Sequence, residues 1–146
     1  MAVLEKGSPD MSDPVFGRTW AISKEQSRFT ASTSPSTETR IYEKVGHGYK
    51  LTVSGMHDGQ PYEWGYTARY DGEAKPVYGR LDVDAIVKHK VTDLITIGSF
   101  TRQGKVVAAY RRETSLDGRT LVVVASGFRP DGTTYFDVLT YKPARS

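Results

Sequence analysis

Residues 105–142 read KVVAAYRRETSLDGRTLVVVASGFRPDGTTYFDVLTYK, three alternating polar and apolar segments separated by Asp117-Gly118 and Asp131-Gly132. An Asp-Gly pair between such segments is the strongest short-range signal for a β-hairpin. The same rhythm extends back to residue 38, with turns at Gly46-His47-Gly48, Asp58-Gly59, Asp71-Gly72 and Gln103-Gly104. The chain is therefore predicted to form hairpins joined end to end, an antiparallel meander.

The predicted strands follow one another at near-regular spacing. We expect a first strand at 15–23, then strands at about 38–45, 49–56, 61–70, 83–91, 94–102, 105–114, 119–128 and 133–142. A short helical turn is predicted at 24–29, and an irregular connection at 71–81. Because a long meander leaves two exposed edges unless it closes, we predict an all-β fold, an antiparallel up-and-down β-barrel of about eight to ten strands.

The composition limits the chemistry that the chain can carry. Its 146 residues suit one domain, predicted at 15–146 after a flexible arm at 1–14. The absence of cysteine excludes disulfides, thiolate metal ligands and a cysteine nucleophile. The three histidines lack the spacing of a metal site. We therefore expect no metal and no cofactor.

The charge pattern and the N-terminus bear on partners and location. The net charge of +3 is spread along the chain, and its densest basic points, Lys88-His89-Lys90 and Arg111-Arg112, do not form the cluster that phosphates require. The N-terminus lacks the apolar run of a signal peptide, and no stretch approaches the length of a membrane span. We expect no nucleic-acid partner, no membrane association and a cytoplasmic location.

Alternation also predicts which side chains point into the barrel. Trp64 and Tyr66 share one face of their strand, and Tyr110 shares a face with Arg112. His89 falls on the same side of its strand as four apolar residues, so an inward position is expected. For the last strand, the pattern does not decide between the face with Tyr135, Asp137, Leu139 and Tyr141 and the face with Thr134, Phe136, Val138, Thr140 and Lys142.

Two polar residues are candidate anchors inside the barrel. An inward Arg112 is a fixed cation that needs either a ligand carboxylate or an internal partner such as Asp137 or Glu43. His89 is either a general base with a pKa lowered by burial or a core residue satisfied by one hydrogen bond. The candidate ligand-binding residues are Trp64, Tyr66, His89, Tyr110, Arg112, Tyr135 and Tyr141.

The segment Phe16-Gly17-Arg18-Thr19-Trp20-Ala21-Ile22 resembles the Gly-x-Trp opening of the calycin group, lipocalins and fatty-acid-binding proteins. Residues 110–123 and 138–142 resemble the closing hairpins of the fatty-acid-binding branch, and the whole pattern is most similar to small bacterial lipocalin-like proteins. The resemblance implies a binding barrel whose bottom is closed by Trp20.

The chain departs from the animal fatty-acid-binding proteins in two places. Residues 24–37 are too short and too rich in Ser and Thr for the two lid helices of that family. Leu139-Thr140-Tyr141 stands where the family has Arg-x-Tyr to hold a carboxylate. Arg112 together with Tyr141 is the expected equivalent, and fatty acid itself is not the expected ligand.

Three functions are compatible with this barrel. The favoured one is the binding of a small hydrophobic or aromatic molecule in the interior. The alternative is a cofactor-free isomerase, cyclase or lyase with His89 or Asp137 as acid/base and a tyrosine or arginine as oxyanion partner. The second alternative is a protein–protein interaction module or a homodimer.

Overall fold

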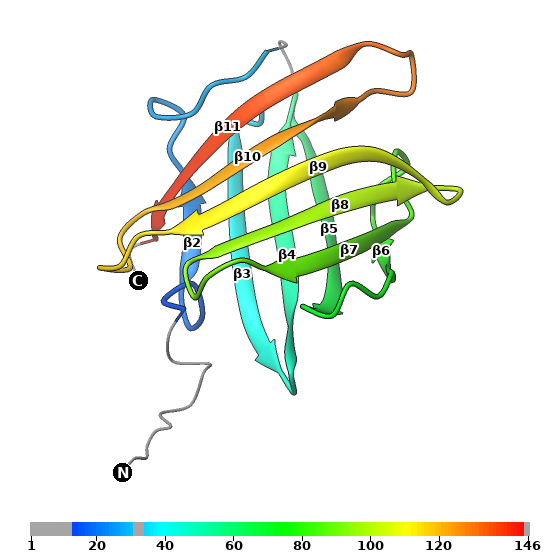
Figure 1. Cartoon of the computed structure of the whole chain (residues 1–146). Helices are drawn as coiled ribbons and strands as arrows, with labels where there is room; N and C mark the ends of the chain where they lie inside the picture. The colour runs from blue at the N-terminus through cyan, green and yellow to red at the C-terminus, as the bar shows by residue number, and fades with distance from the viewer. Residues whose placement is uncertain (1–12, 31–33, 145–146) are drawn as a thin grey trace.

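The computed structural model describes residues 13–30 and 34–144, and it is a closed antiparallel β-barrel (Figure 1). Within these residues the chain forms ten strands: β2 (Thr19–Ile22), β3 (Thr37–Val45), β4 (Gly48–His57), β5 (Gln60–Arg69), β6 (Lys75–Tyr78), β7 (Ala85–Lys90), β8 (Ile95–Arg102), β9 (Lys105–Thr114), β10 (Leu121–Phe128) and β11 (Thr134–Pro143). No helix able to span a membrane occurs in this part of the chain.

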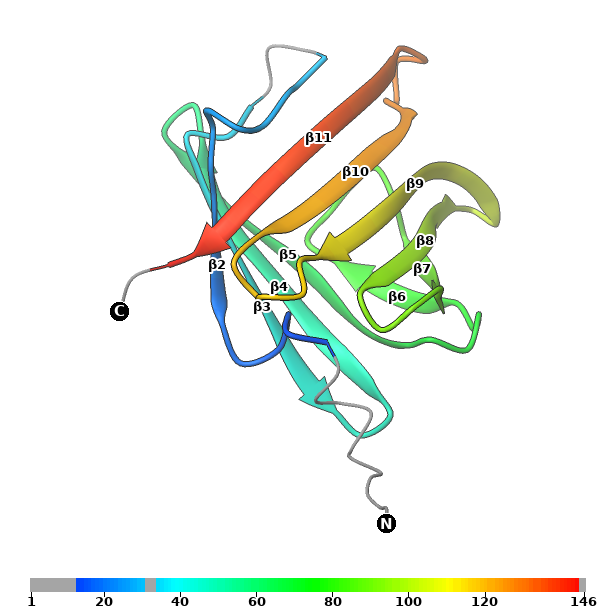
Figure 2. The same cartoon turned by 60° about the vertical axis from the view of Figure 1, so that its left-hand side comes forward.

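Strands that follow one another in the chain are neighbours around the whole barrel. The ring closes where β11 pairs with β2, with Tyr141 opposite Ile22 and Pro143 opposite Trp20. Figure 2 shows the same ring from a second direction. This arrangement confirms the predicted all-β, up-and-down barrel.

The Gly-containing turns make the tight hairpins that the sequence indicates. Asp58 and Gln103 have φ angles of 51° and 52°, and the glycine after each of them also has a positive φ. Two successive residues in this left-handed region form the turn whose twist matches paired strands. Accordingly, β4 and β5 pair up to His57 and Gln60, and β8 and β9 pair up to Arg102 and Lys105.

The predicted helical turn at 24–29 is wrong. The segment contains one turn, in which the Ser27 amide donates to the Lys24 carbonyl over 3.4 Å. Arg28 then exchanges two backbone hydrogen bonds with Val138 of β11, of 2.7 and 2.8 Å. Because these backbone groups are used by the barrel wall, they are not available to a helix.

Two further boundaries differ from the prediction. The connection at 71–81 contains β6, which is held by two residue pairs to β5 and two to β7. Residues 1–12 of the predicted arm lie outside the described residues, but Asp13 and Pro14 belong to the barrel. Asp13 is only 7% exposed, and its Oδ1 accepts a hydrogen bond of 3.0 Å from the Val15 amide.

Four strand glycines lie directly across from tyrosines, and at three of them an added Cβ would meet the tyrosine side chain. These three pairs are Gly55 with Tyr62, Gly65 with Tyr78, and Gly98 with Tyr110. A Cβ at Gly98 would lie 2.5 Å from the Tyr110 ring, and one at Gly55 would lie 2.5 Å from the Tyr62 hydroxyl. Each tyrosine ring therefore covers backbone that a larger residue would occupy.

The two ends of the barrel differ. Residues 13–18 lie across one end, which we call the closed end, and residues 23–30 lie near the other (Figures 1 and 2). At the closed end Val15 and Trp20 are fully buried, and Trp20 Nε1 donates to the Val15 carbonyl over 3.0 Å. This packing closes that end of the barrel with residues 13–18.

Candidate functional site

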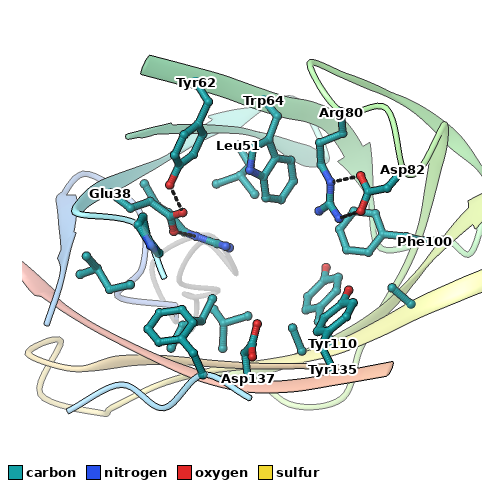
Figure 3. A pocket seen from close by; sticks show the side chains of 18 of the residues that line it. Glu38, Leu51, Tyr62, Trp64, Arg80, Asp82, Phe100, Tyr110, Tyr135 and Asp137 are labelled. Carbon is teal, nitrogen blue, oxygen red and sulfur yellow. Dashed lines mark hydrogen bonds and ion pairs between the residues drawn. The ribbon is translucent and has the colours of Figure 1, made fainter. Parts of the chain in front are cut away.

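A cavity of about 600 Å³ occupies the barrel interior away from the closed end (Figure 3). This volume is within the range of small-molecule sites. Phe29 and Pro35, from the segment after β2, border the cavity. Its aromatic lining residues are Phe29, Tyr42, Tyr62, Trp64, Tyr66, Phe100, Tyr110 and Tyr135.

The aromatic rings form a continuous wall that extends from β5 to β8 and β9. The Trp64 and Phe100 rings meet edge to face, with centroids 6.0 Å apart. Phe100 in turn lies 5.8 Å from Tyr110, and Trp64 lies 6.4 Å from Tyr66. Such a wall presents both ring faces and ring edges, which is favourable for holding a planar apolar molecule.

A buried ion pair lies in the wall on β3. The Glu38 and Arg40 side chains are 10% and 9% exposed, and Arg40 Nε lies 3.4 Å from Glu38 Oε2. Tyr62 donates to Glu38 over 2.6 Å, and Tyr141 also donates to this carboxylate. Burial and the neighbouring Glu38 raise the pKa of Tyr62, so its hydroxyl remains a donor. The carboxylate is thus satisfied by the protein itself.

A second ion pair lies at the opening of the cavity. Arg80 donates two hydrogen bonds to Asp82, of 2.8 and 2.6 Å (Figure 3). The same guanidinium lies over the rings of Trp64 and Phe100, at 4.7 and 4.9 Å from their centroids. Burial acts to raise the pKa of Asp82, but the hydrogen bonds and charge of Arg80 hold it below its ordinary value.

Four of the predicted ligand-binding residues line the cavity. Trp64, Tyr66, Tyr110 and Tyr135 all border it. In the last strand the face with Tyr135 and Asp137 points inward. Asp137 Oδ1 accepts a hydrogen bond of 3.1 Å from the Thr30 amide. The structure thus decides which face of the last strand points inward, which the alternation of its residues left open.

Tyr141 is buried on the same inward face of β11 but does not border the cavity. Its hydroxyl donates to Glu38 and accepts from Arg40 Nε over 2.9 Å. Tyr141 thus supports the buried ion pair of β3 from behind. The expected pairing of Tyr141 with Arg112 is wrong, because Arg40 takes that place.

Arg112 points inward as expected, but into the closed end rather than the cavity. It is 1% exposed and its Nη1 lies 3.1 Å from Asp13 Oδ2. Thr96 and Tyr70 accept hydrogen bonds of 3.1 and 3.3 Å from its Nη2. Of the two alternatives for Arg112, internal pairing is the observed one.

The partner of Arg112 is Asp13, neither Asp137 nor Glu43. The sequence could not indicate this pair because Asp13 lies in a segment without periodicity, 99 residues before Arg112. A role for Arg112 as an anchor for a ligand in the cavity is therefore not supported by its position.

The predicted inward position of His89 is wrong. His89 is exposed, pairs across the strands with Ile97 on the outer face, and borders a separate surface hollow with Arg111. Lys88, its neighbour in β7, points inward instead and is 0% exposed. Because the lysine stem is apolar, Lys88 continues the inward face of Ile86, and the apparent apolar face of this strand is the outer one.

Sequence reasoning missed most of the charged residues of the interior. The sequence pattern does not single out Glu38, Arg40, Arg80 and Lys88, since charged side chains are rarely buried. One signal was present on β3, where Glu38 and Arg40 alternate in step with Tyr42. Tyr42 is buried, so the polar face of this strand is its inward face.

Within residues 13–30 and 34–144 there is no group of three or more His, Asp or Glu side chains that could hold a metal ion. The chemistry that the cavity offers is that of aromatic faces, tyrosine hydroxyls and paired charges. Comparison of the chain with protein-family models and with curated proteins gives no match.

Proposed function

We propose that the barrel binds a small, largely aromatic molecule in its interior. The observation that carries this proposal is the 600 Å³ cavity with its wall of aromatic rings. The proposal includes the lipocalin-like assignment made from residues 16–22 and a cytoplasmic location. The homodimer stays a prediction from the sequence.

The charges of the cavity wall indicate that the ligand need not be charged. Glu38 is paired with Arg40, and Arg80 is paired with Asp82. Each cation also lies against the Trp64 ring, at 5.6 Å for Arg40 and 4.7 Å for Arg80. Because the charges of these two pairs satisfy one another, a ligand gains most from apolar and ring contacts near them.

A reaction with His89 as its acid/base is not proposed, and Asp137 is the one of the two candidates that borders the cavity. Asp137 borders the cavity, whereas His89 lies on the outer face of the barrel. The wall of the barrel separates the two side chains. An acid/base group must be within hydrogen-bond reach of its substrate, and His89 does not meet that requirement for a molecule in the cavity.

The binding proposal can be tested with 4-nitroanisole, a neutral aromatic probe, and isothermal titration calorimetry on the full chain. Trp64→Ala removes the ring that contacts both arginines and Phe100, and we expect roughly tenfold weaker binding. Phe136→Ala is the matched control, because Phe136 is an aromatic residue of β11 that is 53% exposed on the outer face.

Native mass spectrometry of the freshly purified chain supplements the titration, since a retained molecule would show its own mass. The proposal is supported if the probe binds with one site and only Trp64→Ala weakens it. It is overturned if the probe does not bind, or if the two variants weaken binding equally, because the probe would then sit on the outer surface.

A further inference from the structure

Lys88 is enclosed by tyrosines beneath the floor of the cavity. Its side chain is 0% exposed, and Nζ lies 4.7 Å from the ring centroid of Tyr49 and 4.6 Å from that of Tyr110. The rings of Tyr66 and Tyr70 follow at 5.5 and 5.9 Å. Nζ donates to the Tyr66 hydroxyl over 3.4 Å and also to the Tyr110 hydroxyl.

This amine forms no ion pair with a carboxylate among residues 13–30 and 34–144. The charged groups that face it are Arg112 of β9, Arg40 of β3 and Asp13, and Asp13 is held by Arg112. Burial, followed by the charges of Arg112 and Arg40, lowers the pKa of Lys88 well below its ordinary value, while Asp13 acts in the opposite direction. A neutral amine is a proton acceptor.

Hydroxyl groups connect this amine to the cavity. Tyr66 and Tyr110 border the cavity, whereas Lys88 does not. The Tyr110 hydroxyl points into the cavity in Figure 3, and it lies 3.4 Å from the Tyr66 hydroxyl. The Tyr49 hydroxyl lies 3.3 Å from that of Tyr66 on its other side. A ligand oxygen placed above Tyr110 is therefore one hydroxyl away from the amine.

We propose that the cavity takes aromatic molecules that carry an acidic hydroxyl, a phenol or an enol, and binds them as their anions. The ligand hydroxyl gives its proton to the Tyr110 oxygen, and the Tyr110 proton passes to Lys88 Nζ. Tyr110 ends neutral, the ligand carries one negative charge and Lys88 carries one positive charge. The inference rests on the proposed function, because it requires that the ligand occupy the cavity.

Ring faces and hydroxyl groups offset part of the cost of charging Lys88, and they stabilise the ligand anion. The ammonium of Lys88 lies among four tyrosine rings, which attract a cation through their faces. The hydroxyls of Tyr66 and Tyr110 can donate to the ligand oxygen, and hydrogen bonds to an anion are stronger than those to a neutral oxygen. A ligand without an acidic proton gains none of this stabilisation.

The test compares 4-nitrophenol with 4-nitroanisole, which has the same ring but no acidic proton. Absorption spectra of protein-bound 4-nitrophenol are recorded about one pH unit below the pKa of the free phenol, where the free molecule is roughly one-tenth anion. We expect the bound molecule to show mainly the phenolate band. Lys88→Met, at a residue that does not border the cavity, should bind 4-nitroanisole as the unchanged chain does. Both Lys88→Met and Tyr110→Phe should lose the phenolate band at least tenfold relative to the phenol band.

The matched controls are Lys50→Met and Tyr78→Phe, because both residues are exposed on the outer face. These controls should keep the phenolate band. The inference is overturned if saturated protein shows the phenol band, or if Lys88→Met and Tyr110→Phe both keep the anion. Binding of 4-nitroanisole without ionisation of 4-nitrophenol removes this inference alone, whereas absence of binding by both probes removes the proposed function with it.

Discussion

The two ends of the barrel contain the same kinds of residue and use them differently. The closed end holds Arg112 against Asp13, and the cavity wall holds Arg40 against Glu38. All four side chains are at least nine-tenths buried, and tyrosine rings surround both pairs. Of these two pairs, only the pair of β3 borders the interior cavity. A buried arginine inside a barrel therefore does not by itself indicate a ligand site.

The segment that lies across each end accounts for the difference. Residues 13–18 cross the closed end (Figure 2), where Asp13 is paired with Arg112 and Val15 is fully buried. Near the other end, Arg28 and Thr30 form hydrogen bonds with β11 instead, so residues 28–30 run along the barrel wall. The interior on that side remains free for a ligand.

The strongest test of this contrast is Asp13→Asn. The substitution leaves the buried guanidinium of Arg112 without its carboxylate, and we expect the free energy of unfolding to fall by about 3–5 kcal/mol. Urea denaturation measures the change. The folded variant should bind 4-nitroanisole with unchanged affinity, since Asp13 does not border the cavity.

The double variant Asp13→Asn with Arg112→Met is the control for Asp13→Asn. Removing the unpaired cation should recover most of the lost stability. A loss below about 1 kcal/mol in Asp13→Asn, or a parallel loss of probe affinity, would contradict the separation of the two ends.

A smaller effect of opposite sign is expected for Lys88→Met. Because the pKa of Lys88 is lowered in the folded state, the unfolded chain binds a proton more readily, and wild-type stability should rise with pH up to the ordinary lysine pKa. Methionine removes the desolvated amine and keeps the apolar stem. We expect a gain of about 1–4 kcal/mol at pH 7.

The pH dependence distinguishes this explanation from better packing alone. The gain in the free energy of unfolding should shrink as the pH rises from 7 toward 9, because the cost of burying the Lys88 amine in the wild-type chain falls over this range. Lys50→Met, at an exposed site, should show no such trend. Denaturation curves at several pH values test this, and a gain that stays constant with pH would refute the titration of Lys88.

The smallest effect is expected at His89. This side chain is exposed on the outer face, so His89→Ala should change the free energy of unfolding by no more than about 0.5 kcal/mol. Affinity for 4-nitroanisole should not change. Calorimetry and urea denaturation measure both quantities, and a tenfold loss of affinity would show that the wall between His89 and the cavity is not closed.

The sequence predicted the barrel because its evidence is local. Gly-containing turns such as Asp58-Gly59 and Gln103-Gly104 lie between alternating segments, and each fixes the register of its hairpin. Strand β6 escaped prediction because it contains Pro76 and has only two paired residues on each side. Its extended form depends on neighbours that are distant in the chain, which local propensity does not report.

The site was predicted in part for the same reason. The aromatic residues Trp64, Tyr66 and Tyr110 were assigned correctly, since apolar alternation indicates the inward face. Hydropathy gave the wrong face for His89 because it counts the neighbouring Lys88 as polar and therefore as outward. In the structure Lys88 points inward, where the hydroxyls of Tyr66 and Tyr110 are hydrogen-bond partners of its amine. Burial of a charge depends on partners from other strands, so it cannot be read from one strand alone.

Two of the glycine–tyrosine pairs, Gly55 with Tyr62 and Gly98 with Tyr110, have a consequence for how this barrel can change over evolution. A side chain at Gly98 would displace the Tyr110 ring, and one at Gly55 would displace Tyr62. In related sequences each glycine should therefore vary together with its tyrosine, as residues in contact do. A change in the size of the cavity would then require paired substitutions. A related protein without Gly98 would have a different residue or ring position at Tyr110, and therefore a different cavity floor and ligand preference.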